Sequence, residues 1–215
     1  AIETPTLSGA VAGWQALLNT RGLTWRRLPE EQRADLDEAR ALALMAANPL
    51  LPVEEDGRLC DPVLRENFVL RVFAYHDWQQ LCARGLSGAA LIQFHSRYKY
   101  LVLSHATTHY RALGKLLAHV GKANLQEVAQ RYIQGLMTAL SVRASRRNHT
   151  NVLMHLQGYF KKVLTPAQKQ ELADTIDKYR TGILPLLVPL TLIRHYLREY
   201  PNSYLAAQVY LNPHP

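Results

Sequence analysis

The chain has 215 residues and a mass of 24.4 kDa, which suffices for one large domain or for one domain with an extension. Apolar residues make up 48% and charged residues 20% of it, which excludes a disordered chain and a coiled coil. The longest largely apolar run, Ile183–Ile193, contains two prolines and is far shorter than the ~20 residues that span a bilayer, so we expect no membrane association. Two cysteines cannot form a disulfide framework, so a cytoplasmic location is expected.

The net charge of +8 is distributed unevenly along the chain. Residues 1–65 carry 7 Lys/Arg and 10 Asp/Glu, whereas residues 66–215 carry 18 Lys/Arg and 7 Asp/Glu. All nine His and all eleven Tyr also lie in the second part. This balance favours an acidic partner, nucleic acid first among them. A basic protein without a polyanionic partner is the alternative.

Helix starts and stops follow one another through the whole sequence. Capping residues precede each apolar-periodic stretch, and Gly or Asn-Pro ends it. In chain order, these signals predict helices over about residues 8–19, 38–47, 61–84, 87–104, 107–120, from 124, from 148 or 150, 165–181 and 184–200. No stretch alternates apolar and polar residues as a strand does. The predicted fold class is therefore all-α, a bundle of seven to nine helices.

The change of composition near residues 50–65 predicts the domain organisation. We expect a helical N-terminal extension over residues 1–49, a linker with an acidic centre over 50–65, and a helical domain over 66–212. In the linker, Asp61 followed by Pro62 is typical of an N-cap with proline at the first helical position.

A first polar cluster lies on two consecutive predicted helices. Its candidate nucleic-acid-binding residues are His95, Arg97, Lys99, His105, Tyr110 and Arg111. Arginine forms forked hydrogen bonds to phosphate, and His and Tyr can stack on bases. Two alternatives remain open: a solvated helix face with hydrogen-bonded core histidines, and a metal site on His105 and His109, for which the stretch offers no third ligand.

A second polar cluster surrounds the predicted helix start near residue 148. Its candidate residues are Arg146, Arg147, Asn148, His149, Asn151, His155, Gln157, Tyr159, Lys161 and Lys162. Helix starts expose N–H groups that suit phosphate, and we expect Asn148 or Thr150 to cap this one. Asn and Gln can read base edges and Tyr can stack on bases. The alternative is a buried hydrogen-bond network that fixes helix packing.

Signatures of catalysis are weak in this sequence. It contains no nucleophile elbow, phosphate-binding loop or dinucleotide fingerprint, and acidic residues are scarce in the basic part. We therefore expect no cofactor and no metal, and an enzymatic activity of the chain on its own stays uncertain.

Several motifs resemble the YbgA-like domain, a bacterial family of unknown function. They are HSRYK at 95–99, YRALG at 110–114 and NHTNVLMHLQGYF at 148–160, and the likeness covers roughly residues 66–212. Domains of this family are often fused behind a desulfidase-like domain that holds an iron–sulfur cluster on cysteines. The resemblance implies a role in presenting thiolated tRNA to such a desulfidase. Neither Cys60 nor Cys82 matches the cluster cysteines, so the desulfidase chemistry itself is not implied.

Residues of about 12–49 resemble a helical piece of the arsenate-reductase-like, thioredoxin-fold family. The segments that carry this likeness are GWQALLN at 13–19 and ALALM at 41–45. The redox cysteine of that family is missing here, so no redox activity is implied.

Together, these observations predict a helical nucleic-acid-binding accessory domain. We expect it to bind tRNA, including thiolated tRNA, and to serve a desulfidase or another RNA-modification enzyme. One alternative is an enzyme that acts on a nucleotide or small molecule through a pocket lined by His, Asn and Tyr, with His95 and His155 essential for turnover. A second alternative is an oligomerisation module that uses the apolar segment 184–193 as its contact surface. The leading hypothesis assumes that the two polar clusters meet in space.

Overall fold

The computed structural model describes residues 50–52, 54, 57–121 and 124–213. The chain divides after Leu51 into two units, and every helix described below belongs to the second, Pro52–Pro215. The helices expected over 8–19 and 38–47, and with them the proposed N-terminal extension 1–49, lie outside the described residues.

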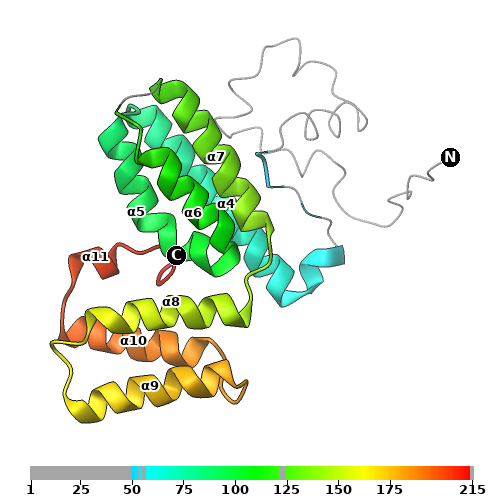
Figure 1. The fold of residues 1–215 in the computed structure, drawn as a ribbon. Helices are drawn as coiled ribbons and strands as arrows, with labels where there is room; N and C mark the ends of the chain where they lie inside the picture. Colours follow the sequence, from blue (N-terminus) through cyan, green and yellow to red (C-terminus); the bar gives the residue numbers. More distant parts are fainter. Residues whose placement is uncertain (1–49, 53, 55–56, 122–123, 214–215) are drawn as a thin grey trace. The chain divides into compact units, whose positions relative to one another are not determined.

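The described part of the chain is helical from end to end (Figure 1). A 3-10 helix, η2 (Gly57–Cys60), precedes eight α-helices: α4 (Pro62–Arg84), α5 (Gly88–His105), α6 (Thr107–Leu117), α7 (Leu125–Ser141), α8 (Arg146–Tyr159), α9 (Pro166–Arg180), α10 (Leu187–Glu199) and α11 (Ser203–Ala206). These residues contain no strand, so the predicted all-α class is confirmed. Among the same residues, no helix is both long and apolar enough to cross a bilayer.

Most helix ends follow the local signals of the sequence. The Asp61 carboxylate accepts hydrogen bonds from the backbone N–H groups of Val63 and Leu64, as expected for the cap of α4. Thr165 forms a capping box with Gln168 at the start of α9, and Gly182, at φ +90°, follows that helix in a conformation that side chains other than glycine rarely adopt. Such local signals fixed the order and approximate length of the helices.

The start of α8 differs from the prediction. Ser145 is the N-cap, and its hydroxyl accepts from the Asn148 N–H at 3.2 Å. Asn148 itself lies inside the first turn, where its side chain donates to the His105 carbonyl at 3.3 Å. The Thr150 hydroxyl donates to the Arg146 carbonyl one turn back. The predicted caps are wrong because a tertiary contact and an intrahelical bond use these side chains.

The start of α10 also differs, because the residues before it end the preceding helix. The N–H groups of Ile183 and Leu184 both donate to the Lys178 carbonyl, at 2.9 and 3.1 Å. Since these bonds close the C-terminal turn of α9, the next helix begins at Leu187 rather than near Leu184.

The helices form two layers. Helices α4 to α7 pack together, and α8, α9 and α10 lie side by side across one end of them (Figure 1). Trp78, Phe94 and Tyr132 join α4, α5 and α7 by aromatic contacts with ring centroids 5.6 to 6.1 Å apart. Such contacts between large buried rings stabilise a helical core well beyond helix propensity alone.

The contact between α5 and α8 joins the two layers, and the C-terminal segment reinforces it. The Val209 N–H donates to the Arg97 carbonyl of α5, and the Gln208 side chain donates to the Ser96 carbonyl. Further along, the Leu211 carbonyl accepts from the Arg194 guanidinium of α10. The C-terminal residues thereby link a helix of each layer.

Two adjacent residues of α5 provide a test of this packing. Leu91 is fully buried, whereas Ile92 is 49% exposed. We expect Leu91→Ala to lower the free energy of unfolding by about 2–5 kcal/mol, because it removes buried methyl groups and leaves a cavity. The matched variant Ile92→Ala should change it by about 0.5 kcal/mol or less. Urea denaturation measures both, and equal losses would contradict the assigned faces of α5.

Candidate functional site

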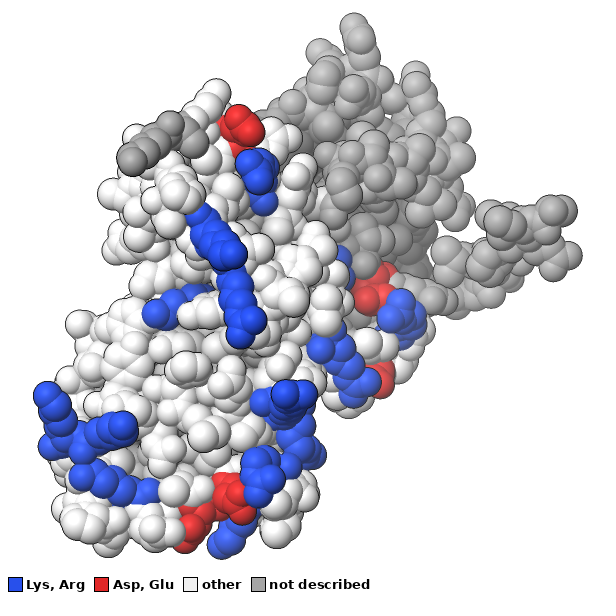
Figure 2. Space-filling model, viewed as in Figure 1, with Lys and Arg blue, Asp and Glu red and all other residues white. Residues whose placement is uncertain are grey.

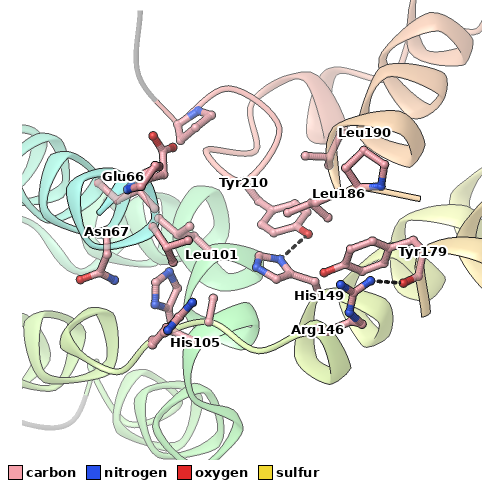
Figure 3. Close-up of a pocket in the computed structure, with 17 residues that line it drawn as sticks. Glu66, Asn67, Leu101, His105, Arg146, His149, Tyr179, Leu186, Leu190 and Tyr210 are labelled. Atoms are coloured by element: carbon pink, nitrogen blue, oxygen red, sulfur yellow. Dashed lines mark hydrogen bonds between the residues drawn. The ribbon is translucent and has the colours of Figure 1, made fainter. Parts of the chain in front are cut away.

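A cavity of about 570 Å³ lies where the two layers meet. We call it the junction pocket. Its lining is contributed by the start of α4, the end of α5, the α7–α8 loop, the start of α8, the end of α9, the start of α10 and the C-terminal segment. Apolar walls surround a smaller number of polar side chains, and Figure 3 shows His149 between Tyr210 and Tyr179 in this space. A cavity of this size and lining is typical of a site for a small organic group.

His149 projects into the pocket from the first turns of α8. Its Nδ1 lies 2.9 Å from the Tyr210 hydroxyl (Figure 3). Burial, with a smaller contribution from the nearby His105, lowers the pKa of His149 to about 4. The imidazole is therefore neutral at pH 7.

His105 lies at the end of α5 and is only 4% exposed. Its Nδ1 is 2.6 Å from the Val142 carbonyl oxygen, which can only accept, so Nδ1 carries the proton. Burial lowers the pKa of this imidazole as well. In the neutral ring, Nε2 is then a hydrogen-bond acceptor without a partner among the described residues.

The two imidazoles offer the pocket opposite hydrogen-bonding functions. Tyr210 is buried, and its hydroxyl makes its hydrogen bond within the described residues to His149 Nδ1. Because a buried hydroxyl proton needs an acceptor, we assign Tyr210 as the donor, which places the His149 proton on Nε2. The pocket thus has one acceptor, on His105, and one donor, on His149.

Two arginines add positive charge to the pocket. The Arg146 guanidinium donates to the Tyr179 carbonyl at 2.6 Å and lies 5.0 Å from the centroid of the Tyr179 ring. Arg146 therefore builds the wall of the pocket. Arg143 also lines the pocket, is exposed, and forms no ion pair within the described part of the chain. The Arg143 charge acts at longer range on Asp61, whose pKa it helps to lower, and its guanidinium stays exposed at the pocket.

Two polar residues of α4 complete the lining. The Asn67 side chain donates to the Leu140 carbonyl at 2.8 Å and so joins α4 to α7. Glu66 brings the only carboxylate that the described residues contribute to the lining. The lining thus contains both signs of charge, with arginine in excess.

A second polar group lies at the other end of the contact between α5 and α8. We call it the aromatic ridge; it consists of Lys99, Tyr100, His155, Tyr159 and Tyr204. The Tyr159 and Tyr204 rings are stacked with centroids 5.5 Å apart. The Tyr100 hydroxyl bonds to the Tyr159 hydroxyl at 3.2 Å, and its ring lies 6.3 Å from that of His155.

The two sequence clusters therefore meet along α5 and α8, in two places. His105, Arg146 and His149 reach the junction pocket, and Asn148 bonds to the His105 carbonyl beside it. Lys99, His155 and Tyr159 reach the aromatic ridge. The remaining cationic and amide candidates Arg111, Arg147, Asn151, Lys161 and Lys162 are exposed, whereas Tyr110 and Gln157 are half-buried.

Two candidates face away from both places. His95 Nδ1 lies 3.2 Å from the Tyr132 hydroxyl of α7, and burial lowers the pKa of His95 to about 4. Arg97 pairs with Asp77 at 3.4 Å. The two histidines expected to be needed for turnover in the enzyme alternative, His95 and His155, contact different rings, those of Tyr132 and Tyr100.

The sequence analysis missed much of the pocket lining. Tyr179, Leu186, Leu190 and Tyr210 come from segments that carry no cluster of polar residues. They reach the pocket only through the packing of the second layer and the return of the C-terminal segment, which no local pattern reveals. Within the described residues, no group of three or more His, Cys, Asp or Glu could hold a metal ion.

Comparison with known proteins gives matches in both parts of the chain. The family model described as protein of unknown function (DUF1722) matches residues 99–215, and that of the ArsC family matches residues 6–52. The uncharacterized protein YbgA of Escherichia coli is 41% identical over 151 residues, which cover 70% of this chain and 89% of that protein. An uncharacterized protein of Haemophilus influenzae is 46% identical over 39 residues, 18% of this chain and 34% of that protein. No solved structure matches the chain.

The neutral histidines predict a pH dependence of stability. His95 and His149 have a pKa of about 4 in the folded chain, against an ordinary value of about 6.5 when unfolded. The unfolded chain therefore binds protons first, and stability falls as the pH drops from about 6.5 toward 4, by up to about 3 kcal/mol for each imidazole.

Urea denaturation at pH 7 and pH 4.5 measures this effect. We expect the fall to be shallower in His149→Gln than in the unaltered chain, and unchanged in the exposed control His76→Gln. An equally steep fall in His149→Gln would show that this imidazole is not held neutral by the fold.

Proposed function

The chain belongs to the DUF1722 family of proteins of unknown function, and we propose that its helical domain is an RNA-binding module that holds one unstacked nucleotide in the junction pocket. The observation that carries the proposal is the lining of this pocket: an acceptor on His105, a donor on His149 and an exposed arginine, Arg143, within apolar walls.

The pocket suits a nucleobase in size and in chemistry. A cavity of about 570 Å³ is large enough for a heterocyclic ring with its sugar. Leu101, Leu186 and Leu190 offer apolar surface to the faces of a ring. Every nucleobase carries a donor next to an acceptor on its pairing edge, which matches the donor and acceptor of the two imidazoles.

The rim of the pocket suits the phosphates of the same strand. Arg143 and the start of α8 lie beside the imidazoles, and exposed Arg147 follows in the first turn. Helix starts and arginines both favour phosphate. Figure 2 shows Lys and Arg over both layers of the described part, with fewer Asp and Glu between them.

Single-stranded RNA fits this arrangement better than a duplex. A base can enter the pocket only when it is unstacked and unpaired, which is how loops and bulges of RNA are recognised. We propose tRNA, thiolated tRNA included, as the natural ligand, and a desulfidase or another RNA-modification enzyme as the partner. The resemblance to the YbgA-like domain, carried by the motifs at 95–99 and 148–160, supports this choice of ligand and partner.

Exposed arginines should set the salt dependence of binding. Because each phosphate contact contributes about −0.7 to the log–log slope of affinity against salt, Arg143→Ala and Arg147→Ala should each flatten that slope by roughly this amount. Arg131→Ala is the control, since Arg131 lies 3.9 Å from the Glu127 carboxylate on α7. Salt titrations of tRNA binding measure the slopes, and unchanged slopes would remove both arginines from the footprint.

Filling the pocket should weaken binding without changing its salt dependence. Leu186→Trp places a large ring in the lining and alters no charge. We expect it to lower the affinity for tRNA by about tenfold or more, because the unstacked base loses its place, while the salt slope stays the same. An unchanged affinity, with the thermal melting temperature also unchanged, would show that the pocket holds no part of the RNA.

A further inference from the structure

We propose that the aromatic ridge is a second base-binding station, at which a nucleobase of the same strand stacks on Tyr159 while the Lys99 ammonium attracts the adjoining phosphate. This inference rests on the proposed function and extends it from one nucleotide to a segment of single-stranded RNA.

The ridge presents an aromatic face supported from behind. Tyr159 is 41% exposed, yet its ring is stacked on Tyr204 and its hydroxyl accepts from Tyr100. Because stacking already holds the Tyr159 ring and part of its surface is open to solvent, it loses little side-chain freedom when a base stacks on it. Aromatic platforms of this kind are what proteins use to bind single strands without strict sequence preference.

Positive charge lies directly beside this platform. The Lys99 ammonium is 5.0 Å from the Tyr204 ring centroid and 5.1 Å from that of Tyr100. Lys161 and Lys162 follow Tyr159 in the chain and are exposed. None of these three lysines forms an ion pair within the described residues, so their charge remains for a polyanion.

A second cavity borders the platform. Tyr159 lines this cavity of about 270 Å³, whose walls also include Tyr200 and Pro201. The one carboxylate among its described lining residues, that of Glu199, lies 3.2 Å from the His195 ring nitrogen Nε2. The cavity lets the edge of a stacked base extend beyond the Tyr159 ring.

The distance between the two stations sets the length of RNA that can use both. His149 and Tyr159 are ten residues apart on α8, which corresponds to about 15 Å along the helix axis. A stacked strand covers this span in roughly four nucleotide steps at ~3.4 Å each, and an extended strand covers it in fewer. A dinucleotide can therefore occupy one station, whereas a hexanucleotide can reach both.

The test is a length series of oligouridylates that compete with labelled tRNA for the full chain. We expect the unaltered chain to bind the hexanucleotide roughly tenfold more tightly than the dinucleotide. Tyr159→Ala should lose this gain and keep the affinity for the dinucleotide. Tyr159→Phe, which retains the ring, should keep the gain, as should Met154→Ala, a control at a 59% exposed position of the same helix.

The outcomes separate this inference from the function on which it rests. If Tyr159→Ala shows the same length dependence as the unaltered chain, the second station is overturned and the pocket proposal stands. If the unaltered chain binds neither tRNA nor any oligonucleotide, both proposals fail. Loss of dinucleotide binding in Tyr159→Ala, with the melting temperature unchanged, also overturns the inference, because the two stations would then not be separate.

Discussion

The crossing of α5 over α8 is the constraint on which the other features of this domain depend. It joins the four-helix layer to the three-helix layer, and the hydrogen bond from Asn148 to the His105 carbonyl fixes one end of it. At the other end, Tyr100 bonds to Tyr159. Since the first contact borders the junction pocket and the second belongs to the aromatic ridge, the crossing that builds the fold also positions both candidate sites.

The histidines at the crossing of α5 and α8 can be buried because they are neutral. A charged imidazole would be costly in this setting, and burial lowers the pKa of both His105 and His149. His105 bonds through Nδ1 to the Val142 carbonyl, and His149 bonds through Nδ1 to the Tyr210 hydroxyl. In both rings, Nε2 remains available for another hydrogen bond. The nitrogens that stabilise the fold and the nitrogens proposed to bind the base are therefore on the same imidazole rings. For the second polar cluster, the sequence left two interpretations open, a binding face and a buried hydrogen-bond network. The same side chains can serve both.

Local chemistry made the fold predictable, while the site needed tertiary structure. Caps such as Asp61 and Thr165 and stops such as Gly182 act within a few residues, so they are visible in the sequence. The prediction that Asn148 caps α8 was wrong because its side chain donates to the carbonyl of His105, which is distant in sequence, instead of bonding to its own helix start. Likewise, Tyr210 reaches His149 across 61 positions of the chain, and no periodicity encodes that contact.

The central claim is that this domain binds RNA through an unstacked base. The most direct measurement is the affinity of the full chain for tRNA and for duplex DNA of similar length across a series of salt concentrations. The account predicts tighter binding to tRNA at every salt concentration, with affinity that falls steeply as salt rises. Equal affinity for the two polymers, or no binding to either at low salt, would contradict it.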